Sequence, residues 1–257
     1  MNADQTVLYS VDGAVARVTL NRPEKRNALN DAVIAGLNDA LKRAAKDERV
    51  RVVVISGAGK DFCSGADLSA LQKIANASVA ENAEDARLLL ELFLLIRQLP
   101  IPVVAAVTGR ALAGGCGLAT ACDLVLAASS SRFGYPEVKI GFVPAIVMAI
   151  LRRNVSEKRA FELITRGAEI SADQAKEFGL VNQVFADDVF ADDVNRYVSE
   201  FEKMSASAIG LTKTLLYQMD GMAFSEALET GADVNVIARL TDDCQQRIAK
   251  FLQKDRD

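Results

Sequence analysis

Two short runs of β-branched residues constrain the fold more than any other feature of the chain. They are residues 51–56 (RVVVIS) and 102–107 (PVVAAV), and each ends at or near a glycine. Runs without polar alternation are typical of strands that are covered on both faces. A leucine-rich helical pattern over residues 83–99 separates the two runs. The sequence therefore predicts an α/β protein.

The N-terminal part of the chain predicts a hairpin followed by a helix. The dipeptide Asp12-Gly13 lies between apolar stretches at residues 7–11 and 14–20, which is a strong hairpin signal. After a polar turn at residues 21–27, apolar residues recur at helical spacing from Val33 to Ala44, with Asn30 or Asp31 as the N-cap. Further short strands are predicted at residues 124–128 and 181–185.

Helical patterns dominate from Ala145 onward. The last three, at residues 189–204, 209–219 and 224–251, contain more apolar residues than terminal helices of a monomer need. We therefore expect a partner subunit to cover them. Without a repeat or a linker to mark a boundary, we divide the chain into an α/β core at residues 1–188 and a helical oligomerisation region at residues 189–257.

Composition excludes several classes of function. The chain has 257 residues, with 30 basic and 34 acidic side chains and a net charge of −4, so nothing attracts nucleic acid or an anionic membrane overall. There is no histidine, which excludes Ser-His-Asp and Cys-His catalysis and His-ligated zinc. The four cysteines lack metal-ligand spacing, so we expect no metal and buried thiols in a reducing cytosol. Residues 1–10 lack the features of an export signal, and no apolar stretch approaches the ~18 residues of a membrane span, so we expect a soluble, cytoplasmic protein.

Two glycine-rich loops follow predicted strands, at residues 56–68 and 109–119. The first could begin a dinucleotide-binding fingerprint, but Phe62 stands where its third glycine should be. Small residues before a helix also let a ligand approach free backbone N–H groups, so two such loops can supply two donors to a developing oxyanion. A structural alternative is that Gly65 only makes a turn, Asp67 only caps a helix and the pair at 114–115 only permits close packing.

Several motifs together resemble the enoyl-CoA hydratase/isomerase (crotonase) family. They are, in order, NRP and NAL between residues 21 and 29, FCSGADL at 62–68, AGGCGLA at 113–119, CD at 122–123, and FGYPEV at 133–138 followed by Gly141. The resemblance runs nearly end to end. It implies a crotonase (ClpP/crotonase-like) spiral of ββα units with a C-terminal helical trimerisation region, assembled as a homo-trimer or as a hexamer that is a dimer of trimers.

The resemblance also implies the catalytic groups. The N–H groups of Ala66 and Gly114 would bind the thioester oxygen as it gains enolate charge, and Glu137 would be the acid/base. Tyr135-Pro136 and the apolar run after Glu137 suggest partial burial, which would raise its pKa. Family hydratases carry a second carboxylate at the position of Gly117, where the missing side chain is expected to leave room for one.

With one carboxylate, the resemblance favours double-bond isomerisation of an enoyl-CoA, because a single base can remove an α-proton and return it at C4. Hydration of a 2-enoyl-CoA and a non-catalytic acyl-CoA-binding subunit are the alternatives. Dienoyl-CoA isomerases are a poorer match, since Ala145 stands where they carry an aspartate. Decarboxylating members that use histidine, and Clp-type proteases, are excluded by the absence of histidine.

The remaining implied residues bind the substrate, of which coenzyme A is a part, so that no separate cofactor is expected. Arg22, Lys25 and Arg26 in the first loop would hold the nucleotide portion, together with Phe251 and Lys254 reaching from a neighbouring subunit. Other residues assigned to substrate binding are Ser64, Asp67, Leu68, Gly117 and Tyr135.

Overall fold

The computed structural model describes residues 5–67, 72 and 76–254, so the predicted substrate residue Leu68 lies outside the described residues. The predicted hairpin is present: strands β1 (Val7–Asp12) and β2 (Val15–Leu20) pair antiparallel from Val7 opposite Leu20 to Asp12 opposite Val15. Gly13 makes the turn with a φ of 56°, in the left-handed region that glycine tolerates.

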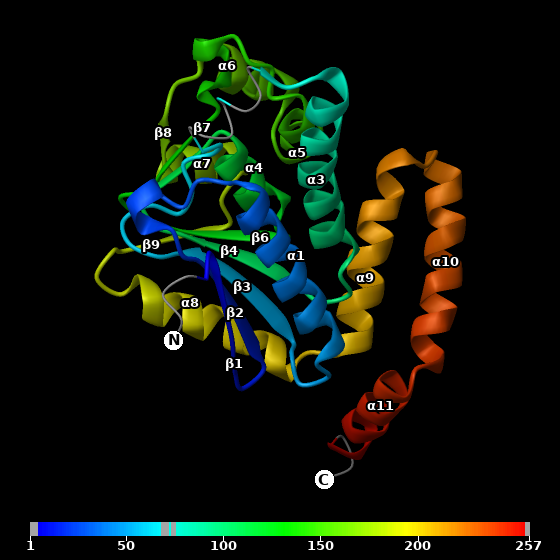
Figure 1. The fold of residues 1–257 in the computed structure, drawn as a ribbon. Coiled ribbons are helices and arrows are strands. Elements are labelled where there is room, and N and C mark those ends of the chain that lie inside the picture. The colour runs from blue at the N-terminus through cyan, green and yellow to red at the C-terminus, as the bar shows by residue number, and fades with distance from the viewer. Residues whose placement is uncertain (1–4, 68–71, 73–75, 255–257) are drawn as a thin grey trace.

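The predicted buried strands form the centre of a six-stranded sheet in the order β1-β2-β3-β4-β6-β9 (Figure 1). Strands β3 (Val52–Gly57), β4 (Val103–Val107), β6 (Leu124–Ala128) and β9 (Gln183–Phe185) continue from β2 in parallel. Every residue of β4 is buried, as expected for a strand without polar alternation. The prediction of an α/β fold is confirmed.

A second, three-stranded sheet explains how the chain turns back after the long strands. Its strands are β5 (Arg110–Leu112), β7 (Arg132–Gly134) and β8 (Ile170–Ser171), with β7 in the middle. Strand β5 comes shortly after β4, and β7 shortly after β6. Strands β4 and β6 are thus each followed by a short strand in the other sheet and then by a helical element, which is the ββα unit of the spiral.

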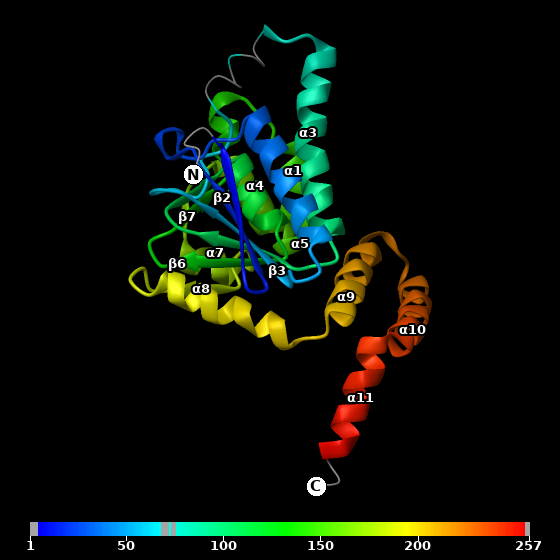
Figure 2. The same cartoon turned by 60° about the horizontal axis from the view of Figure 1, so that its bottom comes forward.

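Helices cover both faces of the large sheet (Figures 1 and 2). Alternate residues of β3 separate the two sides: Val53 and Ile55 belong to the main core with α1 (Asp31–Lys46), α3 (Val79–Gln98), α4 (Gly114–Ala121) and α5 (Ala145–Asn154). Val52 and Val54 pack on the other side against α8 (Phe190–Ser199). Asn30 caps α1 by accepting from the Val33 N–H. The smaller helical elements are η1 (Pro23–Lys25), η2 (Pro136–Ile140), α6 (Glu157–Arg166), α7 (Ala172–Phe178) and η3 (Glu200–Lys203).

The C-terminal part is helical, as predicted, but it has one more break than expected. Helix α9 (Ala206–Gln218) and η4 (Met219–Gly221) are followed by α10 (Phe224–Leu240) and α11 (Asp242–Lys254). The prediction of a single helix over residues 224–251 was wrong, because Thr241 has an extended conformation and its hydroxyl accepts from the Cys244 N–H, which caps a new helix.

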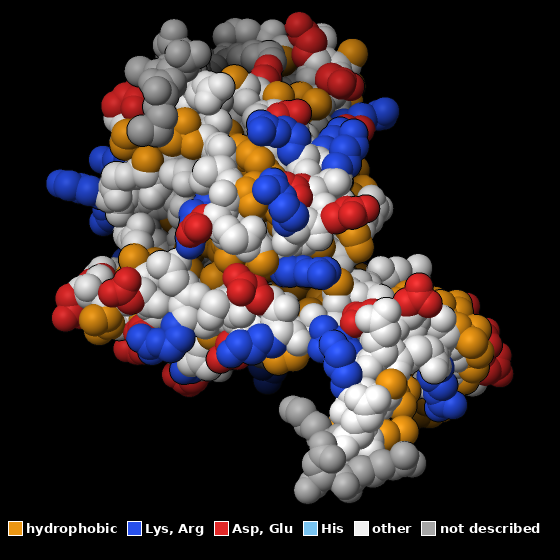
Figure 3. Space-filling view, turned by 90° about the horizontal axis from the view of Figure 1, so that it is seen from below, with side chains coloured by type: hydrophobic (Ala, Val, Ile, Leu, Met, Phe, Trp, Pro, Cys, Tyr) orange, Lys and Arg blue, Asp and Glu red, His pale blue; other side chains and the backbone are white. Residues whose placement is uncertain are grey.

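Helices α10 and α11 project from the rest of the molecule (Figures 1 and 2). Hydrophobic side chains gather on this projection in Figure 3, and large ones are exposed along it: Phe224, Leu228, Val236, Ile237, Leu240, Ile248, Phe251 and Leu252. Acidic and basic side chains are mixed over the visible face. No helix in the described part of the chain is long and apolar enough to cross a membrane. The division of the chain at residue 188 remains a proposal; α8, which follows it, packs against the sheet.

Candidate active site

The first glycine-rich loop is held so that the Ala66 N–H faces away from its pairing partner. Leu29 donates its N–H to Gly65 O (2.7 Å) and accepts from the Asp67 N–H (3.1 Å), which makes a parallel bridge opposite Ala66. Since peptide groups alternate along an extended strand, the Ala66 N–H points to the side opposite Leu29. Gly65 has a φ of +92°, and a Cβ built on it would lie 2.7 Å from Ala113 Cβ and 3.5 Å from Gly114 N. The two predicted loops therefore meet here.

A buried cluster of polar side chains holds the first glycine-rich loop in place. The Arg22 guanidinium forms an ion pair with Asp67 (Nη2 to Oδ2, 2.6 Å) and donates to Ala28 O (2.9 Å), and both charged side chains are largely buried. The fully buried Asn27 side chain accepts from the Arg22 N–H and donates to Ala58 O and Asp61 O. Arg22 and Asp67 were predicted to touch the substrate, and the structure pairs them with each other.

The second loop leads directly into the N-terminus of α4. Gly114 is its first helical residue, and Ala113 before it is a non-glycine residue with a φ of 51°. The Ala113 N–H donates to Gly134 O at the end of β7 (2.8 Å), so the loop is joined to the strand that precedes Glu137. The first N–H groups of a helix have no partner within it, so Gly114 presents a donor beside Gly65.

Close packing explains why residue 115 is a glycine, but not why residue 114 is one. A Cβ on Gly115 would lie 2.3 Å from Cys63 O, so the helix needs glycine there. A Cβ on Gly114 would meet only Leu29 Cδ1 at 3.5 Å, which is an ordinary contact. The packing alternative therefore explains Gly115, whereas Gly114 has no steric reason to be glycine.

The expectation of free space at Gly117 was wrong. A Cβ built there would lie 2.2 Å from Val147 Cγ1 on α5, and Phe93 Cζ on α3 would be 3.3 Å away. Both side chains are almost completely buried. The volume that was expected to leave room for a carboxylate is occupied by hydrocarbon from α3 and α5, which the sequence around Gly117 did not indicate.

Glu137 lies in the short helix η2, where Pro136 occupies the first turn. The side chain is half-buried, and its Oε2 atom is buried without a hydrogen-bond partner among the described residues. Burial raises the pKa of Glu137, and a hydrogen bond from its own backbone N–H offsets this in part. The expected partial burial is confirmed.

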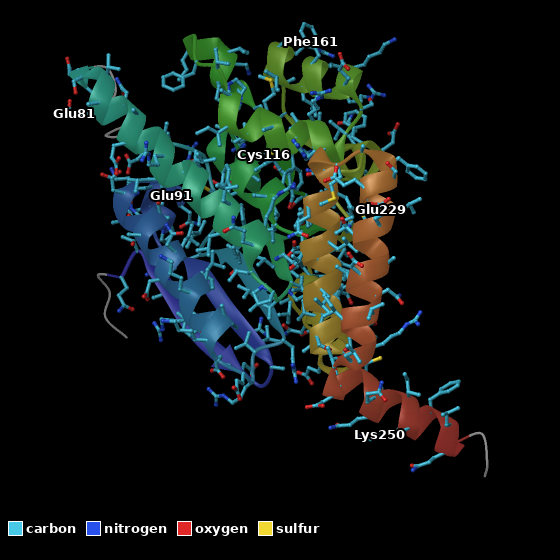
Figure 4. All side chains as sticks on the ribbon, turned by 90° about the vertical axis from the view of Figure 1, so that its right-hand side faces the viewer. Glu81, Glu91, Cys116, Phe161, Glu229 and Lys250 are labelled. Atoms are coloured by element: carbon cyan, nitrogen blue, oxygen red, sulfur yellow. The ribbon has the colours of Figure 1, made fainter. Side chains whose placement is uncertain are left out.

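Tyr135, two residues before this glutamate, connects the segment to α4. Its side chain is fully buried, and its hydroxyl is 3.2 Å from Thr120 Oγ1, which also bonds to Cys116 O and Gly117 O. Burial raises the pKa of the Cys116 thiol to about 12, so this cysteine is an inert part of the core. Figure 4 shows Cys116 of α4 toward the middle of the molecule, whereas Phe161 of α6 lies at its periphery.

The other predicted substrate residues are more scattered. Ser64 belongs to the first loop, where its N–H donates to Arg26 O (3.0 Å). Lys25 is exposed in η1. Phe251 is exposed on α11, and Lys254 is the last residue of that helix, which projects away from α4 (Figures 1 and 2). One chain therefore does not bring the end of α11 to the two glycine loops.

Sequence reasoning missed the side chains that shape the site without chemistry of their own. They are Phe93 and Val147, which fill the volume beside Gly117, and Thr120, which anchors Tyr135. Only Thr120 carried a local signal, since it stands one helical turn after Gly117 in a run of small residues.

Comparison with known proteins gives this arrangement a family. The chain matches the Enoyl-CoA hydratase/isomerase family over residues 10–256. It is 35% identical to the 2,3-dehydroadipyl-CoA hydratase of Escherichia coli K12 over 249 residues, which cover 96% of either chain. It is 32% identical to the 1,2-epoxyphenylacetyl-CoA isomerase of the same organism over 254 residues, covering 96% of this chain and 95% of the other.

A solved structure gives the same result for the fold. The crystal structure of an enoyl-CoA hydratase from Mycobacterium smegmatis matches with a TM-score of 0.92 and 33% identity, covering 97% of this chain and 96% of that one. The molecule is thus a crotonase-fold enzyme. More narrowly, the chain belongs to the enoyl-CoA hydratase/isomerase family and is an acyl-CoA enzyme of that family.

Proposed function

We propose that this enzyme moves a double bond in an enoyl-CoA thioester with Glu137 as its single acid/base. The observation that carries the proposal is the pair of carboxylate positions: Glu137 has a buried oxygen without a partner in the described structure, whereas Val147 and Phe93 fill the position beside Gly117. One carboxylate can move a proton between two carbons, but water addition is served better by two.

In the proposed reaction, the Ala66 and Gly114 N–H groups donate to the thioester oxygen of a 3-enoyl-CoA. The Glu137 carboxylate removes a proton from C2, and the electrons of that C–H bond form a dienolate whose oxygen is held by the two donors. The resulting carboxylic acid returns the proton to C4 as the C2=C3 double bond forms. Glu137 ends the cycle as it began. Its raised pKa supports this role, because it brings acid and base forms closer together in energy at neutral pH.

Hydration of a 2-enoyl-CoA is the second candidate, and the names of two of the relatives favour it. One of the two Escherichia coli relatives and the Mycobacterium smegmatis protein are called hydratases, whereas the other Escherichia coli relative is called an isomerase. In this chain a hydratase would have to activate water and deliver a proton with Glu137 and no carboxylate at Gly117. The hydrocarbon that fills that position supports isomerisation over hydration.

Two further expectations belong to the same proposal. The exposed apolar side chains of α10 and α11 support assembly as a homo-trimer or as a hexamer. Such an assembly would let Phe251 and Lys254 of a neighbouring copy meet the nucleotide part of coenzyme A beside Lys25 and Arg26. Coenzyme A is then part of the substrate, with no separate cofactor, and the compartment proposed is the cytoplasm.

The deciding experiment measures turnover of 3-enoyl-CoA and 2-enoyl-CoA panels by the purified protein and two variants at one position. Gly114→Pro removes the N–H donor, so isomerisation should fall by about 10²-fold or more. Gly114→Ala keeps the donor and adds a methyl group in ordinary contact with Leu29, so it should remain active. Equal losses in both variants would mean that packing, and not the N–H group, matters at Gly114.

Glu137→Gln completes the test. It should lower isomerisation by roughly 10²–10⁴-fold and leave CoA affinity nearly unchanged. Full hydratase activity in the unmodified protein that persists in Glu137→Gln would refute the assignment, since another group would then carry the protons.

A further inference from the structure

A cavity of about 530 Å³ lies between α3, α5 and α9. One part of its wall is apolar, with Leu90 and Phe93 from α3 and Ile146 and Ile150 from α5. Two cations, Arg97 on α3 and Arg153 on α5, contribute to the same wall. The cavity thus has both a hydrocarbon lining and a charged lining, which an ordinary packing defect between helices lacks.

The apolar part of the cavity adjoins the proposed reaction site. Phe93 lines the cavity and is also the residue whose Cζ lies 3.3 Å from a Cβ built on Gly117. Val147, the other residue beside Gly117, stands between the cavity residues Ile146 and Ile150 on α5. Phe93 therefore borders both the volume beside Gly117 and the cavity.

The arginines are not fully neutralised by the acidic group between them. Asp220 Oδ2 lies 2.5 Å from Arg153 Nε and 3.6 Å from Arg97 Nη1, so one carboxylate serves two guanidinium groups. Arg97 stacks on the Tyr217 ring at 4.4 Å, and its Nε atom is buried without a hydrogen-bond partner within the described structure. The Tyr217 hydroxyl donates to Asp123, and Asp123 also pairs with Lys213. Among the described side chains that line the cavity, two cations, Arg97 and Arg153, therefore face one carboxylate, Asp220.

We propose that this cavity receives the far end of an acyl group that carries a terminal carboxylate, so that the preferred substrates are ω-carboxyacyl thioesters of coenzyme A. This proposal rests on the proposed function and specifies its substrate class. Arg97 is one helical turn from Phe93, about 6 Å along the axis of α3, so a chain that passes Phe93 reaches the guanidinium within a few carbons. The methylene groups would contact Phe93 and Ile150, and the carboxylate would accept from Arg97 and Arg153.

Binding of saturated thioesters tests the proposal without any turnover. Calorimetry would compare two acyl-CoA thioesters of equal carbon number, one ending in a carboxylate and one in a methyl group. The carboxylate-ended ligand should bind the unmodified protein at least about 10-fold more tightly, and Arg97→Gln should reduce this preference by about 10- to 100-fold, the range for a hydrogen bond to a charged group. Arg152→Gln, on an exposed neighbour of Arg153 outside the cavity, is the matched control and should keep the preference.

A second variant covers the case in which Arg97→Gln disturbs the packing of α9. Asp220→Asn keeps both arginines and removes the competing carboxylate, so it should increase the preference for the carboxylate-ended ligand. Equal affinity of the unmodified protein for the two ligands would overturn the proposal, as would a preference that Asp220→Asn leaves unchanged. A clear preference without isomerase activity would refute the proposed reaction alone, so the two failures can be told apart.

Discussion

Replacement of the buried lysine of α9 should show what attaches the C-terminal helices to the core. Lys213 is 7% exposed, and its ammonium donates to Ile96 O (2.8 Å), Ile101 O (3.0 Å) and Asp123 Oδ2 (2.6 Å). Burial lowers the pKa of Lys213, and the attraction of Asp123 opposes this. Asp123 also accepts from the Tyr217 hydroxyl and the Val103 N–H, both at 2.6 Å.

Replacement of Lys213 and replacement of Asp123 should not lower the free energy of unfolding by the same amount. Loss of one partner from a buried ion pair costs about 3–5 kcal/mol. Lys213→Met leaves the Asp123 carboxylate with two donors, so we expect a loss of about 3 kcal/mol in the free energy of unfolding. Asp123→Asn leaves a buried ammonium without a counter-charge, so we expect about 5 kcal/mol. The double variant should lose less than the sum, because neither charge is then stranded.

Urea denaturation at one fixed protein concentration measures these differences, since the stability of an oligomer depends on concentration. Lys42→Met, on the exposed face of α1, is the control and should change the stability little. Losses below about 1 kcal/mol for both single variants, the value of an exposed pair, would refute the reasoning.

Three further predictions concern the site. Gly117→Glu alone should lower the free energy of unfolding by about 1–3 kcal/mol, because its Cβ meets Val147. The double variant with Val147→Ala should fold and show new hydration of a short 2-enoyl-CoA, measured by loss of the enoyl absorbance. Hydration by the single variant would contradict this prediction. Because burial raises the pKa of Glu137, the folded state binds this proton more tightly than the unfolded chain, and the protein loses stability as the pH rises through the folded pKa. Glu137→Gln should therefore have a higher melting temperature than the unmodified protein at pH 8, and the difference should close toward about pH 4. A difference in melting temperature that does not change with pH would contradict this prediction. Arg22→Gln should lower kcat more than CoA affinity in steady-state kinetics, because Arg22 holds the Ala66 loop through Asp67; the reverse pattern would indicate direct contact with phosphate.

Local patterns in the sequence were sufficient for most of the fold. The run at residues 51–56 became β3 because an apolar strand needs cover on both faces, and the Asp12-Gly13 turn became a hairpin because glycine supplies the required backbone angle. The break at Thr241 was missed, since the helical pattern continues across it and only a cap reveals it. Propensity does not distinguish one long helix from two that are capped end to end.

The candidate site was likewise predicted only in part from the sequence. The burial of Glu137 followed from its apolar neighbours in sequence, and the meeting of the two glycine loops followed from motif order. The filling of the space at Gly117 did not follow, because Phe93 and Val147 come from helices that lie 24 residues before and 30 residues after it in the sequence. A local sequence pattern does not encode contacts between such distant positions, and so the absence of a side chain was mistaken for the presence of space.

The bridges that hold the two loops separate the parts of this enzyme that can evolve independently. Leu29 pairs opposite Ala66, and Cys63 pairs opposite Ala111, through backbone atoms alone. Point substitutions exchange side chains but retain peptide groups, so a replacement at Ala66 or Gly114 other than proline keeps the proposed N–H donor, while an inserted or deleted residue would shift the donors by one peptide. The positions of Gly117 and Glu137 have no such protection. A lineage with this backbone can therefore change the side chains at and around these two positions while the proposed backbone donors are inherited unchanged.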